Sequence, residues 1–297
     1  MGLEDNMQFF TSGYNRFELD EKRFFEAFPK RPEDAHKGSS GRILLVSGSF
    51  GMAGAASLNI LGAKALGAPY IIAAVPEDIY TVVAAANITA VYLPYAAGYG
   101  RSCIMNAPSS IRAAALGSGS DNNPELEDIL MLMLYGRYPL VLDASALKLL
   151  KDKKDIASKR QYPLILTPHP GEFALICPDL ASLAGSDPVK AAAECSADFG
   201  AVTVLKGPNT VVASPDGRVY INETGNQGLA QAGSGDVLSG MITAMLSFAD
   251  DPFEASCMGV FAHGLAADRL CMKHARQTMP LEDIPKAMDE LFFEHGF

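Results

Sequence analysis

Residues 42–75 read RILLVSGSFGMAGAASLNILGAKALGAPYIIAAV and contain the first unit of the pattern that decides the fold. Residues 42–47 form an apolar, β-branched run, which is typical of a buried strand. A glycine-rich turn and a helix of small residues follow through Leu66, and residues 70–75 predict a second strand. A helix between two strands can serve as the crossover connection that parallel strands need, so these two strands are expected to lie parallel.

The same alternation of strand and helix continues along the chain. Further strands are expected at residues 113–116, 139–142, 163–166 and 202–205, and helices at residues 77–86, 124–135 and 188–199. A hairpin is predicted between Thr210 and Asn222, where a Pro-Asp-Gly turn occurs, and amphipathic helices fill the last third. The fold class is therefore α/β, with a mostly parallel sheet covered on both faces and ligands at the carboxyl ends of its strands.

Composition excludes several classes of protein. The 297 residues carry 24 Lys and Arg against 34 Asp and Glu, a net charge of −10, whereas a nucleic-acid binder needs a basic surface. No apolar stretch is long enough to cross a bilayer, and residues 1–30 lack the pattern of a signal peptide. The five cysteines are scattered and never spaced as Cys-x-x-Cys, which favours free thiols. We expect a cytoplasmic protein that binds neither membranes nor nucleic acid.

The loop over residues 225–236 reads GNQGLAQAGSGD and leads into an amphipathic helix that is expected to start near Val237. Neither a Walker A sequence nor a Gly-x-Gly-x-x-Gly fingerprint is present in the chain. Small residues before a helix let backbone N–H groups approach a phosphate, and the helix dipole favours the negative charge. Asp236 would lie beside this phosphate. A helix cap is the alternative role for Asp236, although capping does not require Gly233 and Gly235.

Other loops at predicted strand ends carry polar groups. Lys206 follows a strand in Leu-Lys-Gly-Pro-Asn-Thr, where it could contact phosphates or simply be solvated. His169 stands between two prolines in Thr-Pro-His-Pro-Gly-Glu, which fixes the backbone beside the imidazole and favours contact with a ligand. Asp143 could orient a metal or a hydroxyl, or cap the next helix. The loops after residues 42–47 and 113–116 are rich in glycine and serine, which allows either tight packing or a backbone cradle.

Taken in order, five motifs resemble the NAD(P)H-hydrate dehydratases, a branch of the ribokinase-like superfamily. The motifs are His36-Lys37-Gly38, Thr167-Pro168-His169-Pro170-Gly171-Glu172, Leu205-Lys206-Gly207 with Thr210, Ala232-Gly233-Ser234-Gly235-Asp236 and Ala262-His263-Gly264-Leu265-Ala266. The resemblance implies a three-layer α/β/α sandwich over residues 36–297, preceded by an N-terminal helical arm over residues 1–35. The family often has a second Asp after the strand that ends at Asp143, and often has Pro where Ser118 stands.

The resemblance also implies an activity. Such enzymes return the S epimer of hydrated NADH or NADPH to NAD(P)H, and they use ADP, releasing AMP and phosphate, or ATP, releasing ADP and phosphate. Mg²⁺ is expected as a cofactor, with ligands that the sequence does not identify. A homotetramer is expected by analogy with relatives. Many relatives carry a fused N-terminal epimerase domain, and the 35 residues before His36 are too few for such a domain. A separate NAD(P)H-hydrate epimerase is therefore expected to act together with this enzyme.

Roles for individual residues follow from the resemblance. Asp236 is the catalytic residue, because it would accept or orient the proton of the substrate's ring hydroxyl during phosphoryl transfer. The residues expected to contact the hydrated dinucleotide are Ala55, Gly119, His169 and Asp236. The residues expected to bind the adenine nucleotide are Lys206, Gly207, Pro208, Asn209, Thr210, Gly233 and Gly235. A carboxylate at a helix N-terminus is expected to be ionised at neutral pH.

Two other functions fit part of the pattern. A small-molecule kinase of the same superfamily, acting on a vitamin-precursor alcohol, would share the Gly-Ser-Gly-Asp sequence. The loops around His169 and Lys206 favour the dehydratase over that kinase. A nucleotide-sensing module without activity would not need a carboxylate at its phosphate site, so Asp236 argues against it.

Overall fold

The strand–helix–strand unit at residues 42–75 forms as its sequence predicts. In the computed structural model, which describes residues 13–31, 33 and 41–297, β2 (Arg42–Val46) pairs in parallel with β3 (Ile71–Pro76). Between them α3 (Ala53–Ala65) crosses one face of the sheet. The backbone turns between β2 and α3 through Gly48 and Gly51, which both have φ near +82°. Glycine adopts this left-handed conformation without the steric cost that a side chain would bring.

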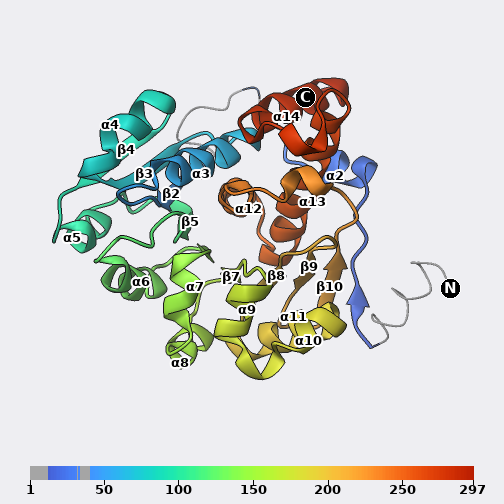
Figure 1. The fold of residues 1–297 in the computed structure, drawn as a ribbon, viewed down its shortest axis with the longest axis horizontal. Helices are drawn as coiled ribbons and strands as arrows, with labels where there is room; N and C mark the ends of the chain where they lie inside the picture. Colours follow the sequence, from blue (N-terminus) through green and yellow to red (C-terminus); the bar gives the residue numbers. More distant parts are fainter. Residues whose placement is uncertain (1–12, 32, 34–40) are drawn as a thin grey trace.

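One ten-stranded sheet forms the centre of the molecule, in the order β1-β10-β9-β8-β7-β6-β5-β2-β3-β4 (Figure 1). The pairs of β9 with β8 and with β10 are antiparallel, and the other neighbours run parallel. The remaining strands are β1 (Asn15–Arg16), β4 (Val91–Tyr95), β5 (Ile111–Leu116), β6 (Leu140–Leu142), β7 (Leu164–Leu166), β8 (Val202–Leu205), β9 (Val211–Ala213) and β10 (Arg218–Ile221). Strand order reverses between β2 and β5, where an open parallel sheet leaves a crevice for ligands.

Helices cover both faces of the sheet, as the alternating side chains of β2 require. Ile43 and Leu45 enter one apolar core, and Leu44 and Val46 enter the other. The first face carries α3 together with α2 (Glu21–Ala27), α4 (Glu77–Ala86), α12 (Ser234–Phe248), α13 (Pro252–Cys271) and α14 (Ile284–Glu294). The second face carries α5 (Gly100–Met105), α6 (Leu126–Leu134), α7 (Ser145–Leu150), α8 (Lys154–Ser158), α9 (Pro170–Ile176), α10 (Leu183–Ser186) and α11 (Pro188–Phe199). The expected three-layer α/β/α sandwich is therefore confirmed.

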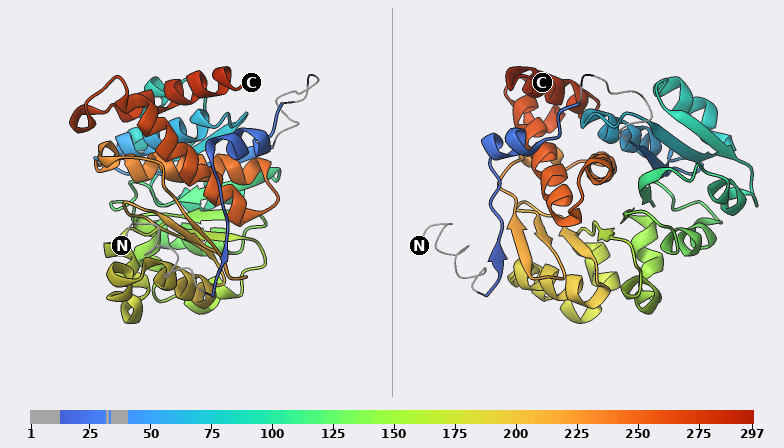
Figure 2. Two further views of the ribbon diagram at one scale, coloured as in Figure 1. Left: turned by 90° about the vertical axis from the view of Figure 1, so that its right-hand side faces the viewer. Right: turned by 180° about the vertical axis from the view of Figure 1, so that it is seen from behind.

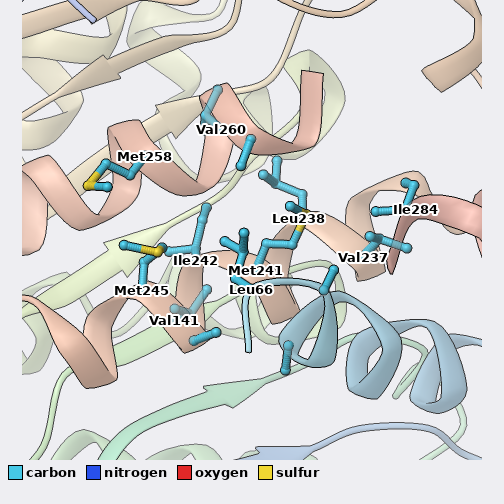
Figure 3. Close-up of a cluster of buried hydrophobic side chains, with 14 of the residues drawn as sticks. Leu66, Val141, Val237, Leu238, Met241, Ile242, Met245, Met258, Val260 and Ile284 are labelled. Atoms are coloured by element: carbon cyan, nitrogen blue, oxygen red, sulfur yellow. The ribbon is translucent and has the colours of Figure 1, made fainter. Parts of the chain in front are cut away.

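Glycines let α12 and α3 approach closely. A Cβ added to Gly62 of α3 would lie 2.0 Å from the carbonyl oxygen of Val237, and one added to Gly240 would lie 2.0 Å from that of Asn59. The Asn59 side chain also donates a hydrogen bond to the carbonyl oxygen of Asp236, at 3.1 Å. Figure 3 shows the apolar side chains of α12 packed between neighbouring helices. This packing fixes the start of α12 against the sheet.

Most predicted elements lie within two residues of their expected bounds. The helices at 77–86 and 188–199 and the strand at 202–205 match to the residue, and the hairpin is present. The helix α12 begins at Ser234, earlier than the expected Val237. The sequence pattern missed β4, whose run Val-Tyr-Leu-Pro-Tyr contains a proline, which strands tolerate best at an edge. It also missed the short α5, α8 and α10, as well as α9.

The N-terminal segment contributes both a helix and a strand. Within it, β1 adds to the sheet beside β10, and α2 lies on α13 and α14 (Figure 2). Phe24 of α2 packs against Phe261, and Phe25 packs against Phe292. The motif His36-Lys37-Gly38 lies outside the described residues. No described helix has the length and apolarity needed to span a membrane. Four short 3₁₀ helices complete the structure, at Pro178–Leu180, Gln227–Leu229, Arg276–Thr278 and Leu281–Asp283.

Candidate active site

The start of α12 is shaped by Gly233, whose φ of 94° requires glycine. A Cβ at Gly233 would also lie 2.3 Å from the Cδ1 of Leu58 in α3, so the Leu58 side chain would have to move to make room for it. No side chain caps this helix end within the described structure. Asp236 lies in the first turn, as the sequence predicted. Backbone N–H groups at an uncapped helix start can bind a phosphate.

Asp143 lies buried at the carboxyl end of β6 and joins three neighbouring elements. Its Oδ1 accepts hydrogen bonds from the Thr167 hydroxyl at 2.7 Å and from the Lys206 Nζ at 2.9 Å. Its Oδ2 accepts a hydrogen bond from the Ser118 hydroxyl at 3.3 Å. The helix α7 begins after Ala144 without a side-chain cap, so the interpretation of Asp143 as a helix cap is wrong.

Lys206 is the cation of this cluster. Its Nζ lies 2.9 Å from Asp143 and 3.7 Å from Glu172, and only 18% of its side chain is exposed. Burial lowers the pKa of Lys206, but the two carboxylates outweigh burial and raise that pKa, so the ammonium stays charged. A Cβ added to Gly235 would lie 3.3 Å from the Nζ, which places Lys206 against the glycine loop. A charge at this position suits a phosphate bound at the start of α12.

Asp236 belongs to the same cluster and is not fully ionised at neutral pH. Burial is the largest cause and, together with the charge of Asp143, raises the pKa of Asp236 from 3.8 to about 7. A hydrogen bond from Ser118 and the charge of Lys206 lower that pKa only in part. Asp236 is therefore ionised less readily than a helix N-terminus alone would predict, because desolvation and a neighbouring carboxylate outweigh the helix dipole. A carboxyl group with such a pKa can exchange a proton near pH 7.

His169 acts as the N-cap of α9. Its Nδ1 accepts hydrogen bonds from the backbone N–H of Gly171 at 3.0 Å and of Glu172 at 3.3 Å. The buried Glu172 completes a capping box by accepting from the His169 N–H at 2.9 Å. Because Nδ1 accepts these bonds, the ring proton is on Nε2. The His169 side chain is 55% exposed, and its Nε2 lies 3.4 Å from the Glu172 carboxylate.

Ala55 and Gly119 meet across the crevice between β2 and β5. A Cβ added to Gly119, where φ is 62°, would lie 2.3 Å from the Cβ of Ala55. The Ser49 hydroxyl donates to the Gly119 carbonyl at 2.8 Å, and the Gly48 N–H donates to the Ser118 carbonyl at 2.8 Å. The structure thus joins the two glycine-rich loops at the crevice that sheet topology predicts.

The loop over residues 207–210 lies at the surface beside Lys206. Thr210 closes it, because its hydroxyl accepts from the Gly207 N–H at 3.3 Å and donates to the Gly207 carbonyl at 3.1 Å. Pro208 and Asn209 are exposed, and a Cβ at Gly207 would meet open space. The structure therefore brings Lys206 and Gly235 together with Asp236, while Pro208 and Asn209 lie outside this cluster.

Sequence reasoning missed roles for three residues near Asp236. Ser118 donates a hydrogen bond to Asp143 and lowers the pKa of Asp236, and Glu172 lies beside Lys206. His263 is buried with its Nε2 3.4 Å from the Ser234 hydroxyl, and burial lowers the pKa of His263 to about 4, which keeps it neutral. Glu172 and His263 stood in the quoted motifs, and Ser118 stood out only as a departure from the family.

Metal binding is not assigned by the described residues alone. Among residues 13–31, 33 and 41–297, no group of three or more His, Cys, Asp or Glu side chains has the arrangement of a metal site. Mg²⁺ usually takes only one or two carboxylates from a protein and the rest of its ligands from water and phosphates.

Comparisons with known proteins agree with this geometry. The family model described as NAD(P)H-hydrate dehydratase matches residues 43–290. The chain is 38% identical over 264 residues to the ADP-dependent (S)-NAD(P)H-hydrate dehydratase of Neisseria meningitidis serogroup B, covering 88% of each protein. It is 34% identical over 282 residues to a bifunctional NAD(P)H-hydrate repair enzyme of Moorella thermoacetica, covering 92% of this chain but only 53% of that enzyme.

Solved structures show the same fold. The ADP/ATP-dependent NAD(P)H-hydrate dehydratase of Bacillus subtilis, co-crystallised with ATP and Mg²⁺, superposes with a TM-score of 0.83 at 30% identity. That comparison covers 95% of this chain and 99% of the other. A ribokinase-like protein of Enterococcus faecalis V583 has a TM-score of 0.82 at 22% identity, which shows the fold alone. With the family model spanning most of the sheet and its helices, the chain belongs to the NAD(P)H-hydrate dehydratase family.

Proposed function

We propose that the protein dehydrates the S epimer of hydrated NADH or NADPH to NAD(P)H, using ADP or ATP as the phosphoryl donor. The observation that carries this proposal is the position of Asp236. Its carboxyl group has a pKa of about 7 and lies next to the charged Lys206, at a helix start suited to phosphate. Relatives with this family's sequence are named ADP-dependent (S)-NAD(P)H-hydrate dehydratases, which supports a lyase over a kinase.

The proposed reaction uses Asp236 as the proton acceptor. Its ionised form takes the proton of the ring hydroxyl while the terminal phosphoryl group moves to that oxygen. Lys206 and the backbone N–H groups of the glycine loop stabilise the phosphate charge. Phosphate then leaves with the C–O bonding electrons as the ring nitrogen donates its lone pair. Loss of a proton from the adjacent ring carbon restores the dihydropyridine, and AMP or ADP is the nucleotide product.

The remaining site residues are assigned as the sequence predicts. Ala55, Gly119 and His169 contact the hydrated dinucleotide, with His169 donating from Nε2. Residues 206–210 hold the adenine nucleotide together with Gly233 and Gly235. The contact between Ala55 and Gly119 and that between Lys206 and Gly235 support this division into two binding regions. Mg²⁺ would neutralise the phosphates and would take most of its ligands from phosphate oxygens and water.

The cellular setting is also proposed. The five cysteines are free thiols, which fits the reducing conditions of the cytoplasm. A homotetramer is proposed by analogy with relatives, and single apolar side chains such as Val82, Ile88 and Tyr99 are at least 64% exposed and available for contacts between copies. The bifunctional repair enzymes among the relatives support a functional link to an NAD(P)H-hydrate epimerase.

A direct assay tests the activity. Purified protein is incubated with hydrated NADH, Mg²⁺ and either ADP or ATP, and the return of NADH absorbance is followed. Absorbance returns if the proposal is right, whereas accumulation of a stable phosphorylated product would indicate a kinase. Failure with both nucleotides would exclude the proposal.

Variants of Asp236 test the mechanism within the same assay. Asp236→Asn should abolish turnover and keep nucleotide binding, because only the proton acceptor is lost. Asp155→Asn, which changes an exposed Asp in the first turn of α8, is the matched control and should leave turnover unchanged. Near-normal turnover by Asp236→Asn would remove Asp236 from the chemistry.

A further inference from the structure

A cavity lies at the carboxyl ends of β2, β3 and β4. It has a volume of about 420 Å³ and is lined by four segments of the chain. They are the turn after β2 with Ser49 and Phe50, the start of α4 with Glu77 and Asp78, residues 95–97, and residues 122–125. The residues assigned to either ligand above do not line this cavity, so its occupant is open to inference.

The cavity is linked by one loop to the cluster that contains Asp236. Ser118 donates a hydrogen bond to Asp143 of that cluster at 3.3 Å, and Asn123, five residues further along the same loop, lines the cavity. Five residues span at most about 18 Å when fully extended. Ser49 also lines the cavity and donates to the carbonyl of Gly119, while the Asn122 N–H donates to the Ser49 hydroxyl at 3.3 Å. Ser49 therefore joins the wall of the cavity to Gly119, a residue assigned above to the hydrated dinucleotide.

The cavity lies on the side of Asp236 opposite to the nucleotide loop. Lys206 follows β8, on one side of the strand-order reversal, whereas the cavity is formed at β2, β3 and β4, on the other side (Figure 1). A ligand whose reacting ring lies at Asp236 can extend in this second direction. The hydrated dinucleotide is long enough to need such a region, because its adenosine half is distant from the reacting ring.

The side chains of the cavity fit an adenosine. Phe50 is 73% exposed at the rim, and an exposed aromatic ring can stack on a base. Glu77 and Asp78 follow β3 directly and present exposed carboxylates. A carboxylate at a strand end is the group that accepts hydrogen bonds from a ribose 2′-hydroxyl in dinucleotide sites.

The charges of the cavity disfavour a phosphate. None of the described residues that line it is Lys or Arg, whereas Glu77, Asp78 and Glu125 are acidic. Glu125 is engaged with the backbone, because its carboxylate accepts from the N–H of Gly98 at 2.8 Å and of Gly100 at 2.6 Å. Glu77 and Asp78 therefore face the cavity as the carboxylates available to a ligand, and they would repel a 2′-phosphate.

We propose that this cavity binds the adenosine half of the hydrated dinucleotide, and that Glu77 and Asp78 select hydrated NADH over hydrated NADPH. The inference rests on the proposed function, since it concerns the substrate of that reaction. It adds a substrate preference, because hydrated NADH has a free 2′-hydroxyl that a carboxylate can bind, whereas hydrated NADPH has a 2′-phosphate that a carboxylate repels.

Comparison of the two substrates tests the preference. The parent protein should turn over hydrated NADH with a kcat/KM about tenfold or more above that for hydrated NADPH. In the double variant Glu77→Gln and Asp78→Asn, this ratio should fall by about threefold to tenfold, chiefly through a lower KM for hydrated NADPH. Glu254→Gln, which removes an exposed first-turn carboxylate from α13, is the matched control and should leave the ratio unchanged.

The outcomes separate this inference from the proposed function. Loss of turnover with both substrates in the parent protein would contradict the dehydratase activity itself. Turnover of both substrates with a preference for hydrated NADPH, or with a ratio that the double variant does not change, would overturn the selectivity and leave the activity standing.

A truncated substrate tests the place of the adenosine. Phe50→Ala should lower kcat/KM for hydrated NADH by about tenfold, because base stacking is lost. It should leave kcat/KM unchanged for hydrated reduced nicotinamide mononucleotide, which lacks the adenosine. Because Phe50 is exposed, its removal leaves the core intact. An equal loss with both substrates, or no loss with either, would overturn the assignment of the cavity.

Discussion

Asp236 gives a prediction about stability that is independent of activity. Its pKa is about 7 in the folded protein, against an ordinary value of 3.8. Between these two pH values the folded state holds a proton that the unfolded chain has released. Folding stability therefore falls as pH rises through this window, and the penalty is complete above pH 7. Asp236→Asn removes the titrating group and with it this penalty.

The magnitude follows from the two pKa values. Each pH unit over which only the folded state holds the proton is equivalent to about 1.4 kcal/mol. From pH 5 to pH 8, the parent protein should lose about 3 kcal/mol through Asp236 that the Asn variant does not lose. The variant's advantage in free energy of unfolding should therefore be about 3 kcal/mol larger at pH 8 than at pH 5. The difference between two pH values cancels effects of the substitution that do not depend on pH.

Urea unfolding of the parent and the variant at both pH values measures this difference. The exposed Asp155→Asn serves as the control, and its effect should be the same at pH 5 and pH 8. An Asn variant with equal advantage at both values, or one that is less stable than the parent only at pH 8, would refute the reasoning. The site would then ionise Asp236 without cost, and burial and Asp143 would not set its pKa.

Two further substitutions test the cluster and the packing. Lys206→Met leaves buried carboxylates without their cation, so it should destabilise the protein by about 3–5 kcal/mol and move the pH dependence of any residual turnover above pH 7. The control Lys148→Met removes an exposed ion pair and should cost under about 1 kcal/mol. Similar costs for the two variants would contradict a structural charge cluster around Lys206. Gly62→Ala puts a Cβ 2.0 Å from the Val237 carbonyl oxygen and should destabilise the protein by about 1–3 kcal/mol or more, as measured by thermal unfolding. The control Gly54→Ala adds a Cβ in open space on the same helix, so it should be neutral or stabilising. Equal effects of the two variants would contradict the close contact between α3 and α12.

The fold was largely predictable from local patterns. Buried parallel strands are continuous apolar runs, and their crossover helices have an apolar face, so α4, α11 and β8 match their predicted bounds. The pattern failed where elements are short or atypical. The edge strand β4 contains Pro94, and α9 begins inside a motif that read as a loop because prolines flank His169.

The sequence predicted the backbone loops of the site but not the side-chain contacts within it. Positions that need a positive φ or a close approach of the backbone to a neighbour favour glycine, as at Gly233 and Gly119. The loops around Asp236 could therefore be identified from their glycines. The side-chain partners could not be identified, because Ser118, Asp143 and Lys206 are far apart along the chain and meet only when the sheet assembles.

By itself, the sequence determined the layered α/β fold, the glycine loop before α12 and the presence of a carboxylate in its first turn. These depend on short-range periodicity and on backbone conformations that few residue types allow. Tertiary structure alone decided the protonation of Asp236 and the partner of Asp143, and it formed the acidic cavity at Glu77 and Asp78. A pKa depends on the burial and charge of neighbours in space, and the strand order that supplies those neighbours is not written in any one segment.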